Sequence, residues 1–323
     1  MPKYAFGETV KTGYELAVGG ILMPYVKGER VEPVCRLWGD FWRRGELALL
    51  FGEQGVGKSA LAVQIADAIS RGVDGGGMPM ECGAQKVVFC DVEHDVKVFE
   101  RRCGGIVFDP NFIRVGINPL YGNSSYLGAA YFEALENTLK DSGARVLVID
   151  SVTAIKNMAC YDPKQELYFA SRLRILQRKL DLSVLVVTDT QGIGHRGRLL
   201  YRHMAGVRYW AGFADSAFGM GFCGDGAGRR YLIQFKSTEG IVYWASNVLC
   251  CDVVSEKDFK GFRFTGTGRE AELLQPPLGE PETSILKLKR ENPRLSLRKI
   301  AERIGVSKMK VKRVLDKYGV KPL

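Results

Sequence analysis

The sequence has 323 residues, of which 46% are hydrophobic and 25% charged, the composition of an ordinary globular protein with room for two domains. No apolar stretch approaches the roughly 18 residues that a membrane-spanning helix needs, and the amino terminus lacks the basic patch and apolar run of a secretion signal. Eight cysteines, none spaced as Cys-x-x-Cys, disfavour a disulfide framework and a zinc site. We therefore expect a cytoplasmic protein with reduced cysteines and no membrane partner.

The net charge of +10 is concentrated near the carboxyl terminus. Residues 281–323 hold 13 Lys and Arg against 4 Asp and Glu, whereas the rest of the chain holds 33 against 32. A charge that served solubility alone would not be localised in this way. The segment therefore predicts an appended module that binds nucleic acid.

Residues 1–35 contain several glycines and no clear periodicity, and we expect them to form an extended arm. From residue 36 to residue 254, strands and helices alternate. Apolar runs predict buried strands at 47–51, 87–90, 146–149 and 184–187. Helical spacing of apolar residues predicts helices within 59–70, 131–139 and 167–180. Strands that are apolar on both faces and alternate with helices are typical of a buried parallel sheet, so the predicted fold class is α/β.

The end of this domain has a different pattern. Apolar residues at 217–220, 231–235 and 241–245 predict strands that are joined by glycine turns without helices. Residues 255–281 end in a stretch with glycines, prolines and no periodicity, which predicts a linker. Residues 282–323 then form a separate small helical domain.

The most specific motif is Gly52–Ser59, which reads GEQGVGKS and matches the phosphate-loop pattern G-x-x-x-x-G-K-[ST]. Its glycines let successive backbone N–H groups converge on phosphate oxygens, and the following helix adds its positive end. Lys58 is expected to reach the terminal phosphates, and the Ser59 hydroxyl to bind Mg²⁺. The residues predicted to contact ATP are Gly52, Glu53, Gln54, Gly55, Val56, Gly57, Lys58, Ser59 and Ala60.

A second candidate residue is Asp150, which ends the apolar run 146–149. Ligands bind at the carboxyl ends of parallel strands, where a carboxylate can hold Mg²⁺ through water. The alternative is an acidic residue that merely caps the end of a strand. Because the chain also has a phosphate loop, we predict that Asp150 joins Ser59 at a magnesium site.

Two further segments carry a family resemblance. Val87–His94 (VVFCDVEH) is similar to the second strand of RecA-fold ATPases, and Asp150–Thr153 (DSVT) resembles their magnesium-binding strand. The resemblance covers residues 36–250 and, within this group, extends to the RepA-type replicative helicases of plasmids and phages. It implies a RecA-like P-loop NTPase domain with a parallel central sheet.

The resemblance also implies roles for single residues. Glu93 would be the general base that accepts a proton from the attacking water. Arg102 resembles an arginine that packs on the nucleotide base, with Arg101 as an alternative. The family's sensor strand would end here at Thr190 and Gln191, of which Gln191 is the candidate nucleotide contact, although RepA-type relatives usually carry a histidine.

An arginine-rich segment, 192–210, follows the sensor strand. In RecA-fold rings the matching loop lines the central channel, and a glycine-containing basic loop suits a phosphate backbone. The candidate contacts to single-stranded DNA are Arg196, Arg198 and Arg202. A solvated loop without DNA contacts is the alternative, and Lys156 and Lys164 flank a second, weaker candidate loop.

Residues 229–240 resemble the hairpin from which hexameric helicases insert a basic residue into the neighbouring subunit's ATP site. A positive charge there would stabilise the transferring phosphoryl group and make hydrolysis depend on assembly. Lys236 is the first candidate for this catalytic role and Arg230 the second.

The carboxyl-terminal segment fits a helix-turn-helix. Ser296 and Ser307 are expected to cap two helices, and Gly305 allows the turn between them. The predicted outward-facing DNA contacts are Lys308, Lys310, Lys312 and Arg313. Lysine mainly contacts phosphate, so sequence specificity is not predicted.

Together these features predict a DNA-dependent ATPase of the RepA type that uses Mg-ATP. The expected particle is a ring, with hexamer the first choice, that moves on single-stranded DNA in plasmid, phage or mobile-element replication and binds duplex DNA through its carboxyl-terminal module. The first alternative is an ATP-switched DNA-binding regulator, loader or recombination factor that does not unwind DNA. The second is a small-molecule kinase, which would have no use for the basic module.

Overall fold

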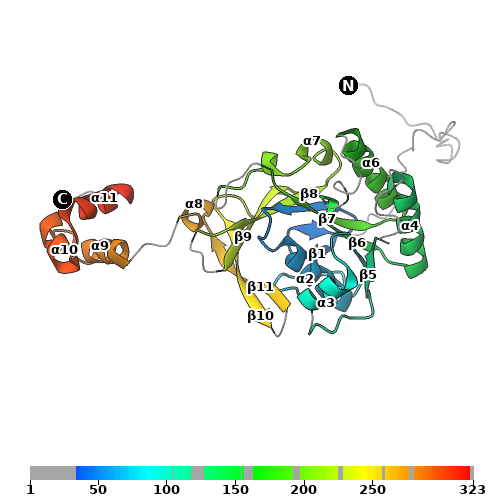
Figure 1. The fold of residues 1–323 in the computed structure, drawn as a ribbon, viewed down its shortest axis with the longest axis horizontal. Coiled ribbons are helices and arrows are strands. Elements are labelled where there is room, and N and C mark those ends of the chain that lie inside the picture. Colours follow the sequence, from blue (N-terminus) through cyan, green and yellow to red (C-terminus); the bar gives the residue numbers. More distant parts are fainter. Residues whose placement is uncertain are drawn as a thin grey trace, which may run out of the picture. The chain divides into compact units, whose positions relative to one another are not determined.

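The computed structural model describes residues 34–103, 105–117, 127–153, 155, 163–191, 197–224, 228–256, 259–275 and 280–320 (Figure 1). The expected arm, apart from its last residues, lies outside the described residues, as do Arg196 and Lys156. None of the described helices has the length and apolar character needed to cross a membrane.

In chain order the strands are β1 (Arg36–Trp38), β2 (Trp42–Arg43), β3 (Leu47–Gly52), β4 (Val87–Asp91), β5 (Phe112–Gly116), β6 (Val146–Asp150), β7 (Ser183–Asp189), β8 (Ser216–Phe222), β9 (Arg229–Lys236), β10 (Val248–Glu256) and β11 (Phe259–Gly268). The helices are α2 (Lys58–Arg71), α3 (Val96–Cys103), α4 (Leu127–Ser142), α6 (Pro163–Lys179), the 3₁₀ turn η2 (Tyr201–His203), α7 (Val207–Trp210), α8 (Glu270–Leu273), α9 (Glu280–Glu291), α10 (Leu297–Ile304) and α11 (Lys308–Lys317).

Within the described residues, β3 to β11 form a nine-stranded sheet in the order β11-β10-β9-β8-β3-β7-β6-β4-β5. Strands β3 to β8 run parallel, and β9, β10 and β11 extend the sheet in antiparallel fashion. The carboxyl ends of the parallel strands therefore meet at one edge, where Gly52 pairs with Asp189 and Asp91 with Asp150. This arrangement confirms the predicted α/β fold class.

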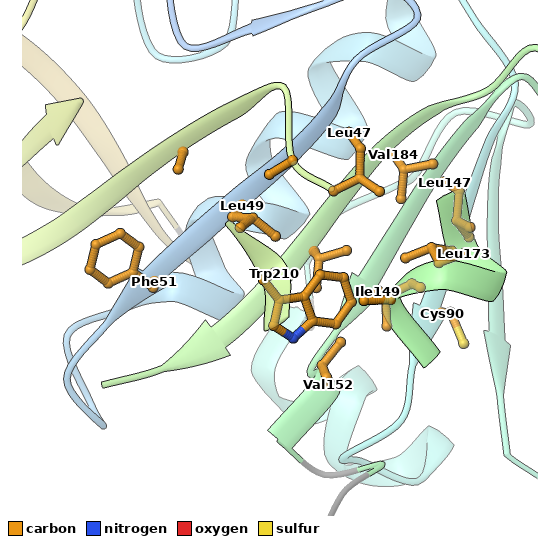
Figure 2. Close-up of a cluster of buried hydrophobic side chains, with 14 of the residues drawn as sticks. Leu47, Leu49, Phe51, Cys90, Leu147, Ile149, Val152, Leu173, Val184 and Trp210 are labelled. Carbon is orange, nitrogen blue, oxygen red and sulfur yellow. The ribbon is translucent and has the colours of Figure 1, made fainter. Parts of the chain in front are cut away.

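Successive residues of the parallel strands point to opposite faces and build two hydrophobic cores. Leu47, Leu49 and Phe51 of β3 lie in one core, which α4, α6 and α7 also line (Figure 2). Ala48 and Leu50 lie in the other core, against α2 and α3. Both faces of the sheet are thus buried, which is why the strands read as continuous apolar runs in the sequence.

The sheet corrects two boundaries of the sequence analysis. Strand β11 and helix α8 lie inside the stretch 255–281 that we expected to be a linker, so the sheet domain continues past Val254. Phe262 of β11 is buried in the second core, and this packing explains why a glycine-containing segment is a strand. Residues 241–245 are not a strand, and the expected strand lies further along the chain as β10.

The cysteines require another correction. Cys35 and Cys82 form a disulfide, with their Cα atoms 5.7 Å apart, contrary to the expectation that all cysteines are reduced. The pairing of β1 with the segment before β4 brings the two residues together, since the Glu81 N–H donates to the Arg36 carbonyl at 2.9 Å. The separation of 47 residues in sequence gives no sign of this contact.

The carboxyl-terminal helices α9, α10 and α11 lie where the sequence predicts a small helical domain. They share a core of their own, which contains Ile285, Ile300 and Leu315. The Ser296 and Ser307 side chains cap α10 and α11 by accepting hydrogen bonds from backbone N–H groups. Between the two helices Gly305 has φ +73°, a left-handed conformation that favours glycine. The structure thus contains two capped helices joined at Gly305, and their assignment as a helix-turn-helix module that binds DNA stays a prediction.

Candidate nucleotide-binding site

The phosphate loop connects β3 to α2 at the carboxyl edge of the parallel strands. Gly55 and Gly57 have φ values of +77° and +112°, which other residues rarely adopt. A Cβ atom at Gly57 would also lie 2.5 Å from the Phe262 ring. This conformation, ahead of the positive end of α2, suits the predicted phosphate-binding role of the loop, which stays a prediction.

Lys58 is the first residue of α2, and its side chain is almost fully buried. Its Nζ atom donates to the carbonyl oxygens of Gly52 and Glu53, at 3.0 and 2.9 Å, and lies 2.8 Å from Asp189 Oδ1. The phosphates of a bound nucleotide offer the same kind of anionic acceptor as Asp189. Lys58 is therefore held close to the place where a terminal phosphate is expected.

The contact between Lys58 and Asp189 was not predicted from the sequence. The sequence analysis placed the sensor at Thr190 and Gln191, one and two residues beyond Asp189. Asp189, and not Thr190 or Gln191, reaches Lys58 because β7 lies beside β3 and its last residue, Asp189, pairs with Gly52. Gln191 is exposed, and its N–H donates to the His203 carbonyl at 2.7 Å.

Ser59 and Asp150 lie together, as the sequence analysis predicted. The Ser59 hydroxyl donates to Asp150 Oδ1 at 3.2 Å, from the first turn of α2 to the end of β6. Burial, helped by the negative charges of Asp91 and Glu93, raises the pKa of Asp150 to about 7, while the Ser59 hydrogen bond and the positive charge of Lys58 oppose the increase. A hydroxyl beside a buried carboxylate with an excess of negative charge fits a hard divalent cation such as Mg²⁺.

Glu93 lies in the turn after β4, next to the strand that carries Asp150 in the sheet. Its side chain is exposed, and its charge acts on Asp150, so both carboxylates belong to the same edge. The Glu93 N–H donates to Asp91 Oδ1 at 3.2 Å. The buried Asp91 thus binds the backbone of the turn, while the Glu93 side chain is exposed to solvent.

Arg102 is at the end of α3, just after the Glu93 turn. Its Nη1 atom lies 2.6 Å from Nε2 of His94, the residue that follows Glu93. Arg101 precedes it on the helix and is exposed. The structure therefore joins Arg102 to the candidate catalytic turn through His94.

The two candidates for the basic finger lie at opposite ends of the same strand, β9. Arg230 pairs with Phe222, at the carboxyl edge, and its Nε donates to the Val56 carbonyl of the phosphate loop at 2.9 Å. Lys236 pairs with Ala217, at the other edge. Its Nζ donates to the carbonyls that follow α7, those of Ala211 at 3.0 Å and Ala214 at 2.5 Å.

The candidate DNA contacts fall into two groups. In the segment after the sensor strand, Arg202 is exposed, whereas Arg198 donates from Nε to the buried carboxylate of Glu270 at 3.0 Å. Lys164 lies in α6. On α11 all four predicted contacts are exposed: Lys308, Lys310, Lys312 and Arg313.

Comparison with known families adds to this geometry. The AAA domain family matches residues 26–191, just over half of the chain, including the phosphate loop, Glu93 and Asp150. The chain belongs to the AAA domain family. No curated protein matches the AAA-domain chain.

Among solved structures, the AAA-domain chain is similar to the crystal structure of KaiC-like protein PH0186 from the hyperthermophilic archaeon Pyrococcus horikoshii OT3. The match has a TM-score of 0.50 and 15% sequence identity, and it covers 69% of this chain and 91% of that one. At this identity the likeness concerns the fold, which is that of RecA-like P-loop ATPases. Family and fold together support nucleotide binding and ATP hydrolysis.

Proposed function

We propose that this AAA-domain protein is a DNA-dependent ATPase of the RepA type, a ring-shaped helicase or translocase. The observation that carries the proposal is the presence, in one chain, of a phosphate loop with clustered acidic residues and of a small helical domain with an exposed basic helix. A nucleotide-binding site alone would fit many reactions. An exposed basic helix beside a second capped helix supports the predicted helix-turn-helix module, and with it a role on DNA.

In the proposed reaction, Lys58 exchanges Asp189 for the terminal phosphates of ATP. Ser59 and Asp150 are the residues that would hold Mg²⁺, directly or through water, and the ion would neutralise phosphate charge. Glu93, exposed at the same edge, accepts a proton from the attacking water. Arg102, which contacts His94 of this turn, would pack on the nucleotide base, as the family resemblance implies.

Two basic surfaces are available for DNA. Exposed lysines and an arginine on α11 suit the phosphates of duplex DNA. Arg198 and Arg202 follow the sensor strand and suit single-stranded DNA in a channel. The Glu270 carboxylate accepts from both the Leu199 N–H and Nε of the Arg198 guanidinium, so DNA would have to share or displace this ion pair at Arg198, whereas Arg202 is exposed.

Assembly into a ring, with a hexamer as the first choice, would complete each ATP site with a basic residue from the neighbouring subunit. Lys236 suits this role because it lies away from the phosphate loop of its own chain, whereas Arg230 contacts that loop in cis. A mixing experiment tests it: a Glu93 variant and a Lys236→Ala variant, each inactive alone, should partly restore turnover when mixed. Additive inactivity in the mixture would exclude Lys236 as a trans residue.

An ATP-controlled DNA-binding switch is the second candidate. It is favoured by the hydrogen bonds of Lys236 to Ala211 and Ala214, which hold this side chain within its own subunit. In a switch, ATP would control assembly on DNA without strand separation.

Turnover and unwinding assays separate the candidates. ATP hydrolysis is measured alone, with single-stranded DNA and with duplex DNA, and strand displacement is measured on a forked duplex, with Lys58→Ala as the inactive control. The proposal predicts stimulation by single-stranded DNA and displacement of the strand. Stimulation without displacement would favour the switch, and turnover that is indifferent to DNA would favour a small-molecule kinase.

A further inference from the structure

A buried acid that the proposed reaction does not use lies directly behind the candidate general base. Asp91 is the last residue of β4, only 2% of its surface is exposed, and it is level with Asp150 on the neighbouring strand. A buried carboxylate is costly unless it is paired and hydrogen-bonded. Its partners should therefore indicate what it does.

One side of the Asp91 carboxylate is neutralised by a neighbouring strand. Arg114, on β5, donates to Asp91 Oδ2 from Nη2 at 2.9 Å and from Nε at 3.3 Å. The same guanidinium donates to the His94 carbonyl at 2.7 Å and lies 4.7 Å from the centre of the Phe99 ring. Arg114 thus holds both the carboxylate and the far end of the turn.

The other side of the carboxylate holds the turn itself. Asp91 Oδ1 accepts the backbone N–H groups of Glu93 at 3.2 Å and His94 at 3.0 Å, and it lies 3.2 Å from His94 Nδ1. An aspartate that accepts N–H groups two and three residues ahead closes a local turn. The Glu93 side chain, which is exposed, takes its direction from this backbone.

We propose that Asp91 is a positioning residue for the general base Glu93. The inference rests on the proposed role of Glu93 in hydrolysis and extends it. Asp91 and Arg114 fix the backbone of the turn, so that the Glu93 carboxylate is held at the distance from the terminal phosphate that an in-line water requires. Small displacements of a reacting group are costly to the rate, since about 1 Å can cost 10²-fold.

A merely structural role for Asp91 is the competing explanation, and a double-mutant cycle with Glu93 separates the two. The variants are Asp91→Ala, Asp91→Asn, Glu93→Gln and both combinations, and the measurements are kcat, KM for ATP and the affinity for a nonhydrolysable ATP analogue. Asp67→Asn is the matched control, because Asp67 also pairs with an arginine, Arg71, but on α2.

Positioning predicts that Asp91→Ala lowers kcat at least about tenfold, with little change in analogue affinity. Asp91→Asn, which keeps the Oδ1 acceptor for the turn, should lose less. In the Glu93→Gln background neither substitution should lower the residual rate further, because no base remains to be positioned. Asp67→Asn should behave like the wild type.

Three results would overturn the inference. In the first, Asp91→Ala lowers kcat by the same factor in the Glu93→Gln background as in the wild type. In the second, the affinity for the ATP analogue falls in parallel with kcat. Normal turnover of Glu93→Gln alone would overturn the general-base assignment and this inference together, and so is distinguishable from the first two. If Asp91→Ala does not fold in a thermal unfolding assay, Asp91→Asn carries the same test.

Discussion

Charged side chains are buried at the carboxyl edge of the parallel strands, next to the phosphate loop, whereas they are exposed on α11. At the edge, Lys58, Asp91 and Asp150 are buried, and each has specific partners at hydrogen-bond distance. On α11 the basic residues are exposed. Buried charges act through geometry, so that single changes should have large effects, whereas exposed charges act through their number and are screened by salt.

The largest effect is expected at the edge. Glu93→Gln should lower kcat for ATP about 10²- to 10⁴-fold, because the attacking water loses its proton acceptor. Nucleotide affinity should change little, since Glu93 lies outside the phosphate loop. Steady-state turnover and analogue binding measure the two quantities, and Lys58→Ala is the control that should lose both. Turnover within twofold of wild type would show that the base is another residue.

The exposed helix should respond in a graded way. Replacing Lys308, Lys310, Lys312 and Arg313 together by alanine should weaken duplex binding at 50 mM salt and remove about 10²-fold of the affinity change between 50 and 200 mM salt, the part that about four phosphate contacts supply. The slope of log affinity against log salt should fall by about 0.9 for each contact removed. Binding titrations at several salt concentrations measure this, and ATP turnover without DNA should stay unchanged. An unchanged salt slope would place the duplex contacts elsewhere.

The buried acid at the edge predicts a pH dependence that exposed lysines do not share. Because burial raises the pKa of Asp150 to about 7, a proton competes with Mg²⁺ as the pH falls through that value. Affinity for Mg²⁺ in the presence of the ATP analogue should fall by up to about tenfold per pH unit below the pKa and level off above it.

The control for this pH dependence is Asp150→Asn, which lacks the carboxylate. The phosphates of the ATP analogue titrate in the same way with both proteins. The difference between the two profiles isolates Asp150. Magnesium titrations between pH 6 and pH 8.5 give both curves. Parallel profiles for the two proteins would show that Asp150 does not titrate in this range.

The smallest effect is expected at Asp189. Asp189→Asn removes the negative charge opposite Lys58, so that the nucleotide no longer competes with it. Affinity for the ATP analogue should rise about fivefold, the scale of one partly exposed ion pair. Fluorescence or calorimetric titration measures the change. Weaker binding would mean instead that the Asp189 carboxylate helps to hold the nucleotide.

The parts of this site that the sequence predicted are those in which one segment carries the signal. The phosphate loop is contiguous, and Asp150 ends an apolar run, so both could be recognised from spacing alone. The contacts Lys58–Asp189 and Asp91–Arg114 depend on which strands are neighbours, β3 with β7 and β4 with β5, and spacing does not determine that order. For the same reason the Cys35–Cys82 disulfide was not predicted.

The sequence also misled where local composition outweighed packing. Strand β11 was taken for a linker because glycines surround it, although Phe262 and Phe264 alternate as strand residues do. The Lys236 assignment is a different case, because it follows from a resemblance in a hairpin, and the hydrogen bonds of Lys236 to Ala211 and Ala214 do not test a role in a neighbouring subunit. That role stays a prediction for the mixing experiment.

In the proposed function, one chain joins a nucleotide-binding site to a DNA-binding module, and several copies assemble to act together. Its most direct test is the mass of the protein in solution, by light scattering, with the nonhydrolysable ATP analogue, with and without single-stranded DNA. We expect the mass of a ring, six times the subunit mass for a hexamer, with a larger fraction of rings when the nucleotide analogue and DNA are present. A monomer under every condition, with an ATP turnover that DNA leaves unchanged, would contradict it.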